Sequence, residues 1–145
     1  MVAAWAFVCD VIQGGAIEVI VSRVSKTRAQ EKRYHAMIRD LSQHVEVNSN
    51  KLDPIAWKSV LVEQFGHELA SSGTPLAKPG RQIMSFDGCR VVQIRPSSSD
   101  FRAGEASDFI EYLYSVGAEY NVTWSDPEEQ AKYRDYWERI QHENM

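Results

Sequence analysis

One segment, from Thr27 to Val45, restricts the possible folds of this chain more than any other. Its large apolar residues recur at the i, i+3, i+4, i+7 and i+11 positions that form one side of a helix: Tyr34, Met37, Ile38, Leu41 and Val45. At about 100° per residue, Arg28, Lys32 and Arg39 project together from the opposite side. We therefore predict a helix that packs on a core through one side and leaves a basic stripe on the other.

Turn and capping signals place the elements that follow. Asp53-Pro54 offers an N-cap and a first-turn proline for a helix from about Ile55 to Leu69. We expect its buried side to include Ile55, Val62, Phe65 and Leu69. Asp87-Gly88 then separates two apolar runs, Gln82–Phe86 and Cys89–Ile94, which is a strong signal for a two-stranded hairpin.

Two more helices are predicted in the last third of the sequence. One carries Phe109, Leu113 and Val116 on its apolar side, and the other begins at Asp126-Pro127 and runs to about Gln141. Upstream, we expect a helix over Met1–Ile12 and a mostly buried strand over Ala16–Ser22. The sequence thus predicts a single compact α+β domain over residues 1–145, a small sheet with a central hairpin packed by several helices.

The charges are distributed unevenly along the chain. Residues 1–96 carry a net charge of +3 and residues 97–145 carry -7, which together give the formal net charge of -4. Between positions 22 and 39 the local charge is +5, because Glu31 is the only acid among the basic residues there. Such a cluster attracts phosphates whatever the global pI is. A solvated helix surface is the plain alternative.

Cysteine use and the N-terminus indicate the compartment. Cys9 and Cys89 have no partner spacing, so we expect neither a disulfide framework nor a zinc cluster, and a reducing cytoplasm fits best. The apolar start, Met1–Ile12, lacks a basic region and contains Asp10, which argues against a signal peptide. No apolar run approaches the length of a membrane span.

The sequence lacks the motifs of the common enzyme classes: it contains no G-x-S-x-G, P-loop, H-E-x-x-H or glycine-rich dinucleotide turn. Its histidines are too scattered to suggest a metal site, and we interpret His35, beside Tyr34, as structural. A metal nuclease needs carboxylates that converge on Mg²⁺, and no spacing singles any out. We therefore expect a protein that is not an enzyme and uses no cofactor or metal.

Nucleic-acid binding agrees better with the residues present. Single strands are bound by several Lys or Arg side chains on one surface, with aromatic rings that stack on bases. The segment around the first helix supplies the cations, and Arg81, Arg90 and Arg95 near the ends of the hairpin could add to them. The candidate rings are Tyr34, Trp57, Phe86 and Phe101, although burial in the core is the alternative for Trp57 and Tyr34.

Four blocks of the sequence resemble the NinB family of phage proteins. The first is S-K-T-R-A-Q-E-K-R-Y-H from Ser25, and the others lie at Leu52–Lys58, Ser97–Leu113 and Gly117–Asp126, in the family's order. The resemblance covers about residues 16–126. It implies a recombination mediator that binds single-stranded DNA as a homodimer, assists recombinase loading in the host cytoplasm and cooperates with the host single-strand-binding protein.

By position, Arg28, Gln30, Arg33 and Tyr34 match the family's motif helix, and Trp57 and Lys58 match its second block. Combining this match with the charge pattern, we predict a set of DNA-binding residues: Lys26, Arg28, Gln30, Lys32, Arg33, Arg39, Lys58, Arg81, Arg90 and Arg95. Two other functions stay open. One is a protein-interaction adaptor that uses the acidic C-terminal helix, and the other is a metal-dependent nuclease.

Overall fold

The computed structural model describes residues 24–145. The helix expected over Met1–Ile12 and the strand expected over Ala16–Ser22 lie outside these residues, so the domain extent of 1–145 stays a prediction. The described elements are α2 (Arg28–His44), α3 (Pro54–Ser71), β1 (Arg81–Met84), β2 (Val91–Ile94), the short 3-10 helix η1 (Ser98–Asp100), α4 (Ala103–Glu119) and α5 (Pro127–Glu143). Their order confirms the predicted α+β class.

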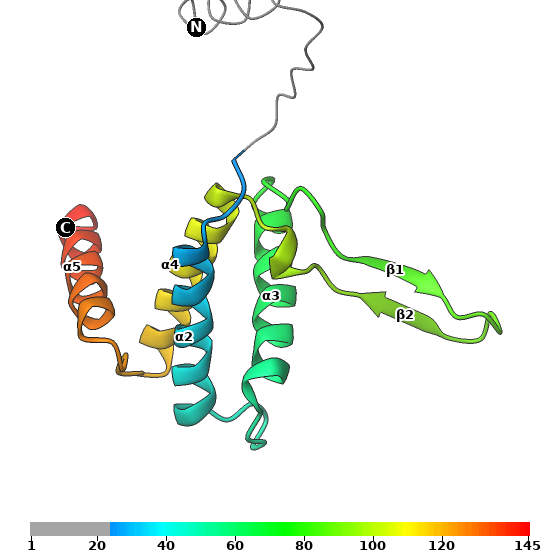
Figure 1. Cartoon of the computed structure of the whole chain (residues 1–145), viewed down its shortest axis with the longest axis horizontal. Coiled ribbons are helices and arrows are strands. Elements are labelled where there is room, and N and C mark those ends of the chain that lie inside the picture. The colour runs from blue at the N-terminus through cyan, green and yellow to red at the C-terminus, as the bar shows by residue number, and fades with distance from the viewer. Residues whose placement is uncertain (1–23) are drawn as a thin grey trace, which may run out of the picture.

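The first helix begins where its capping residues predict. Thr27 accepts a hydrogen bond from the backbone N–H of Gln30 at 3.1 Å, and Gln30 accepts one from the N–H of Thr27 at 2.9 Å. The apolar stripe of α2 packs against α3 on one side and α4 on the other. Figure 1 shows these three helices side by side, with α5 beyond α4.

Aromatic rings from all three helices fill the centre of the core. The ring of Phe109 on α4 lies 5.4 Å from that of Tyr34 and 5.1 Å from that of Phe65, centroid to centroid. Phe101, from the connection into α4, closes the cluster at 5.3 Å from Phe109. All four side chains are buried, so the helical body has a complete apolar centre of its own.

The buried side of α3 differs from the prediction at one residue. Val62 and Phe65 are buried and Leu69 is half-buried, but Ile55 is 77% exposed. The buried side is centred near Leu61 and Phe65, and Ile55 falls at its edge in the first turn. Trp57, on the same side as Leu61, is buried in its place.

The predicted hairpin is present, but its strands end farther from the turn than expected, at Met84 and Val91, and helices do not pack over it as predicted. Its strands pair antiparallel from Arg81↔Ile94 to Met84↔Val91, and every strand residue is exposed. It projects from the body on the side away from α5 (Figure 1). The turn is wider than Asp87-Gly88 alone, because the Ser85 N–H bonds the Arg90 carbonyl at 2.8 Å. Gly88 has a φ of 68°, which favours glycine there.

Candidate nucleic-acid interface

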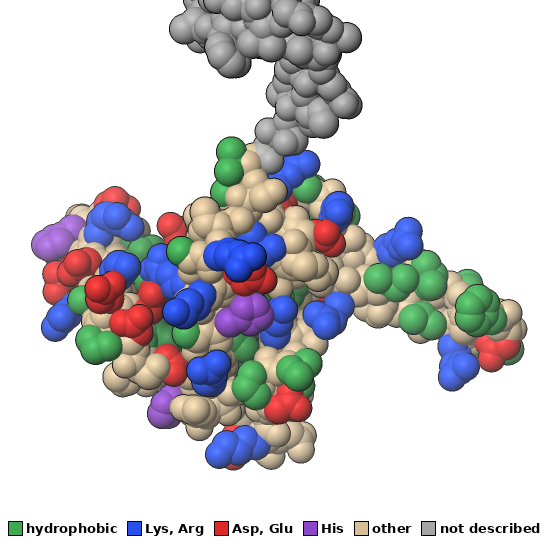
Figure 2. Space-filling model, viewed as in Figure 1, with side chains coloured by type: hydrophobic (Ala, Val, Ile, Leu, Met, Phe, Trp, Pro, Cys, Tyr) green, Lys and Arg blue, Asp and Glu red, His purple; other side chains and the backbone are tan. Residues whose placement is uncertain are grey.

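Six basic side chains from three parts of the chain surround the exposed side of α2. We call this surface the basic face, and its members are Lys26, Arg28, Lys32, Arg39, Lys58 and Arg95. Four of them are exposed, whereas Lys26 and Lys58 are half-buried. Figure 2 shows Lys and Arg side chains spread over α2 and toward the base of the hairpin, with few acidic side chains among them. The predicted basic stripe is therefore present and accessible.

The segments that contribute to the basic face are close enough to interact electrostatically. Burial lowers the pKa of the Lys58 ammonium, and the positive charges of Arg95 and Lys26 lower it further. Lys26 is held in place because its Nζ donates to the Ser99 carbonyl at 2.7 Å. Hence α3, the segment after β2 and the segment before α2 all converge on one positive surface.

This positive charge is not neutralised by the acidic half of the chain, as far as residues 24–145 show. The ion pairs among them join Arg33 to Glu129, Lys78 to Asp100, Arg90 to Asp87 and Lys132 to Glu128. None involves a member of the basic face. Within α2, Glu31 is the one acid beside it. Among residues 24–145, the cations of this surface therefore have no carboxylate in an ion pair with them.

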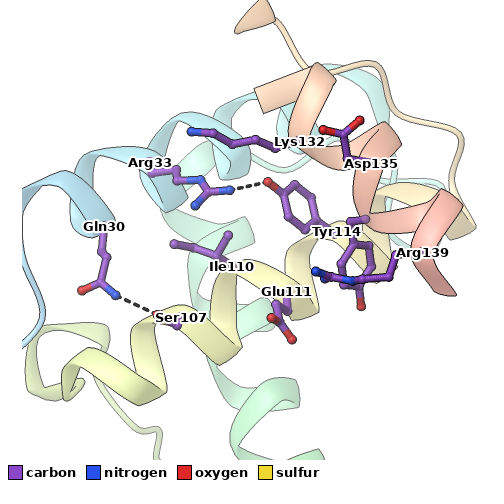
Figure 3. A pocket seen from close by; sticks show the side chains of 10 residues that line it. Gln30, Arg33, Ser107, Ile110, Glu111, Tyr114, Lys132, Asp135 and Arg139 are labelled. Carbon is purple, nitrogen blue, oxygen red and sulfur yellow. Dashed lines mark hydrogen bonds between the residues drawn. The ribbon is translucent and has the colours of Figure 1, made fainter. Parts of the chain in front are cut away.

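Two predicted residues, Gln30 and Arg33, instead connect α2 to the other helices. Gln30 donates to the Ala103 carbonyl at 3.0 Å and to Ser107 Oγ at 2.9 Å, beside its capping role. Arg33 donates to both carboxylate oxygens of Glu129 at 2.6 Å and to the Tyr114 hydroxyl. Figure 3 shows both side chains directed into the groove between α2, α4 and α5. We therefore leave them out of the basic face.

The Arg33–Glu129 pair is largely shielded from water. The Glu129 side chain is 7% exposed and that of Arg33 is 32% exposed. The bonds to Glu129 raise the pKa of the Arg33 guanidinium, although burial opposes the rise. Burial and the bond with Glu129 raise the pKa of the Tyr114 hydroxyl. This network fastens α5 to α2 and α4.

The hairpin arginines lie in different settings. Arg95 directly follows β2 and belongs to the basic face, and Arg81 begins β1 at the base of the hairpin. Arg90 lies at the far end, where its guanidinium is 3.5 Å from the Asp87 carboxylate in an exposed pair. The structure thus brings Arg95 to α2 and α3 but separates Arg90 from them by the length of the hairpin.

Of the four rings considered for base stacking, three belong to the core. Tyr34, Trp57 and Phe101 are at most 4% exposed, so they cannot meet a base in the folded protein. Phe86, in the hairpin turn, is fully exposed. The sequence did not separate these cases, because aromatic residues at helical spacing occur in cores and binding surfaces alike.

The comparisons with known proteins agree with the predicted family. A profile described as NinB protein matches residues 6–125. The chain belongs to the NinB family. Protein ninB of Escherichia phage lambda is 27% identical over 110 residues, which is 76% of this chain and 67% of the relative. Protein ninB of Salmonella phage P22 is 26% identical over 110 residues, with 76% of this chain and 68% of that protein covered.

A solved structure also resembles this NinB-family chain. It is described as a structural-genomics NinB structure, and it matches with a TM-score of 0.55 over 97% of this chain and 93% of its own. At 23% identity, this likeness shows the fold. Among residues 24–145, no helix is long and apolar enough to cross a membrane. The same part of the chain contains no group of three or more His, Cys, Asp or Glu side chains placed to hold a metal ion.

One residue that we had interpreted as structural, His35, borders the basic face. It follows Lys32 by three positions and precedes Arg39 by four, so it lies on the same side of α2. Its side chain is half-buried, with its ring 4.9 Å from that of Tyr34. The sequence could have identified His35 by its helical spacing from Lys32 and Arg39, if the predicted basic stripe had included histidine as well as Lys and Arg.

Proposed function

We propose that this protein is a non-enzymatic phage recombination mediator that binds single-stranded DNA through the basic face. The observation that carries the proposal is the basic face itself, six exposed or half-exposed cations with no ion pair among residues 24–145. Lys and Arg side chains that neutralise phosphates release counterions, which supplies most of the sequence-independent affinity for DNA. The preference for single strands rests on the family resemblance.

We further propose that the protein acts as a homodimer. The hairpin supports this, because it exposes an apolar surface that the helices between residues 24 and 145 leave uncovered: Ile83, Met84, Phe86, Val91, Val92 and Ile94. An isolated two-stranded hairpin is marginally stable in water, and exposed apolar patches mark protein contacts. Two copies related by a two-fold axis would cover both hairpins at once. Recombinase loading and cooperation with a host single-strand-binding protein are proposed from the resemblance alone.

The test is a fluorescence-anisotropy titration of labelled single- and double-stranded oligonucleotides at low and high salt, with and without Mg²⁺. We expect tighter binding to the single strand and weaker binding as salt increases. The triple variant Arg28→Gln, Lys32→Gln, Arg39→Gln should lose most of the affinity. Its salt dependence should be less steep by about 2 in the log–log slope, at roughly 0.7 per phosphate contact.

A matched control removes three exposed cations from the acidic end of the chain: Lys132→Gln, Arg134→Gln, Arg139→Gln on α5. It changes the net charge by the same amount but should bind nearly as the unaltered protein does. Equal losses in both triple variants would show that only overall charge matters and would contradict the assigned surface. An unchanged curve for the α2 triple variant would favour an adaptor, and Mg²⁺-dependent cleavage would favour a nuclease.

A further inference from the structure

We infer that His35 is a phosphate-contacting residue of the basic face and that DNA binding there is accompanied by proton uptake at its imidazole. This inference rests on the proposed function, and it adds a residue and a pH dependence to it. Its geometric basis is the position of His35 between Lys32 and Arg39 on the exposed side of α2.

The surroundings of His35 are mostly positive. Lys58 from α3, Arg39 from α2 and Lys26 from the segment before α2 act on it as cations, and Glu31 on α2 acts as the single acid. One side of the imidazole packs near the ring of buried Tyr34, with the two planes tilted by 45°. His35 as a whole is half-buried. In our inference, a phosphate held by the neighbouring cations contacts the imidazole.

In the free protein, these surroundings favour the neutral imidazole. Burial lowers the pKa of His35 below its ordinary value of 6.5, and the charges of Lys58, Arg39 and Lys26 lower it further. A bound phosphate reverses the electrostatic part of this effect, since it neutralises the cations and brings negative charge to the ring. The imidazolium form also has two N–H donors for phosphate oxygens. The bound form thus has the higher pKa.

The sign of the pH effect follows from this difference. Between the two pKa values, DNA binding takes up a proton, so affinity should increase as pH decreases through that interval and level off below the pKa of the free protein. If binding raises the pKa of His35 by one unit, the association constant changes by about tenfold across the interval. The added contact should also steepen the log–log salt slope by about 0.7 at the lower pH.

The experiment is the anisotropy titration with a labelled single-stranded oligonucleotide at about pH 5.8, 7.0 and 8.0, above the range in which ordinary carboxylates titrate. His35→Gln should bind with little pH dependence. His35→Lys, which carries a permanent charge, should bind tightly at all three pH values. His44→Gln is the matched control, because His44 is an exposed histidine at the end of the same helix. It should keep the pH dependence.

A second readout does not depend on affinity. An NMR titration of the imidazole carbon-bound protons of His35, with and without the oligonucleotide, should show the pKa of His35 increase on binding. Binding with superimposable curves at the three pH values, or pH dependence that persists in His35→Gln, would overturn this inference and leave the proposed function intact. Absence of DNA binding at every pH would overturn both.

Discussion

Phe109 and Phe86 represent two regions that use the same side chain in opposite ways. In the helical body, Phe109 is fully buried and contacts rings from α2, α3 and the connection before α4. In the hairpin, Phe86 is fully exposed. Charges follow the same division: Arg33 in the body has a shielded partner, whereas Arg90 in the hairpin has an exposed one. The body buries its aromatic rings and the Glu129 carboxylate among its own helices, whereas the hairpin leaves its apolar side chains exposed.

The largest effect is expected from a matched pair of phenylalanine substitutions. Phe109→Ala should lower the free energy of unfolding by about 3–5 kcal/mol, because it removes a buried ring and leaves a cavity. At protein concentrations low enough to keep the chain monomeric, Phe86→Ala should leave the unfolding of the body unchanged. Urea titrations followed by circular dichroism measure both variants at that low concentration. A large loss of stability in Phe86→Ala would break the comparison, since it would show that the hairpin tip is part of the folding core.

The two arginine pairs provide the next test. Arg33→Gln leaves the Glu129 carboxylate with 7% exposure and without its cation, so we expect a loss of about 2–3 kcal/mol in the free energy of unfolding. Arg90→Gln removes a pair that water already screens, and thermal unfolding should not detect it. Equal losses in the free energy of unfolding from the two substitutions would mean that burial does not make the Arg33 pair more stabilising than the Arg90 pair. If Arg33→Gln folded normally but lost DNA binding, Arg33 would have to be counted among the residues of the basic face.

Substitutions in the hairpin should have the smallest effect on the free energy of unfolding, but a clear effect on the self-association of the protein. Ile83 and Val92 are direct cross-strand partners, and Ile83→Thr with Val92→Thr reduces the apolar surface while keeping residues suited to strands. In the proposed homodimer this variant should shift toward the monomer, measured by sedimentation velocity over a range of concentrations. The neighbouring pair offers the control, Gln82→Thr with Gln93→Thr. Dimers that persist in the first variant would place the interface elsewhere.

Local patterns determined most of the secondary structure before any tertiary contact was known. The apolar stripe of α2, the Asp53-Pro54 start of α3 and the Asp126-Pro127 start of α5 each act within one or two helical turns, so the sequence alone predicts them well. The position of the hairpin follows from Asp87-Gly88 for the same reason, although the observed loop is wider than these two residues. The basic stripe on α2 was also readable, because helical periodicity decides which side chains share a side.

Contacts between distant segments decided the rest. Only the tertiary structure shows that Arg33 forms an ion pair with Glu129, which lies 96 positions away in the sequence. Arg28 and Arg39 have no such partner among residues 24–145. It likewise places Lys58 and Arg95 beside α2, buries Tyr34, Trp57 and Phe101, and leaves the hairpin uncovered. Charge and aromaticity are properties of a residue, whereas burial and pairing depend on which segments the fold brings together.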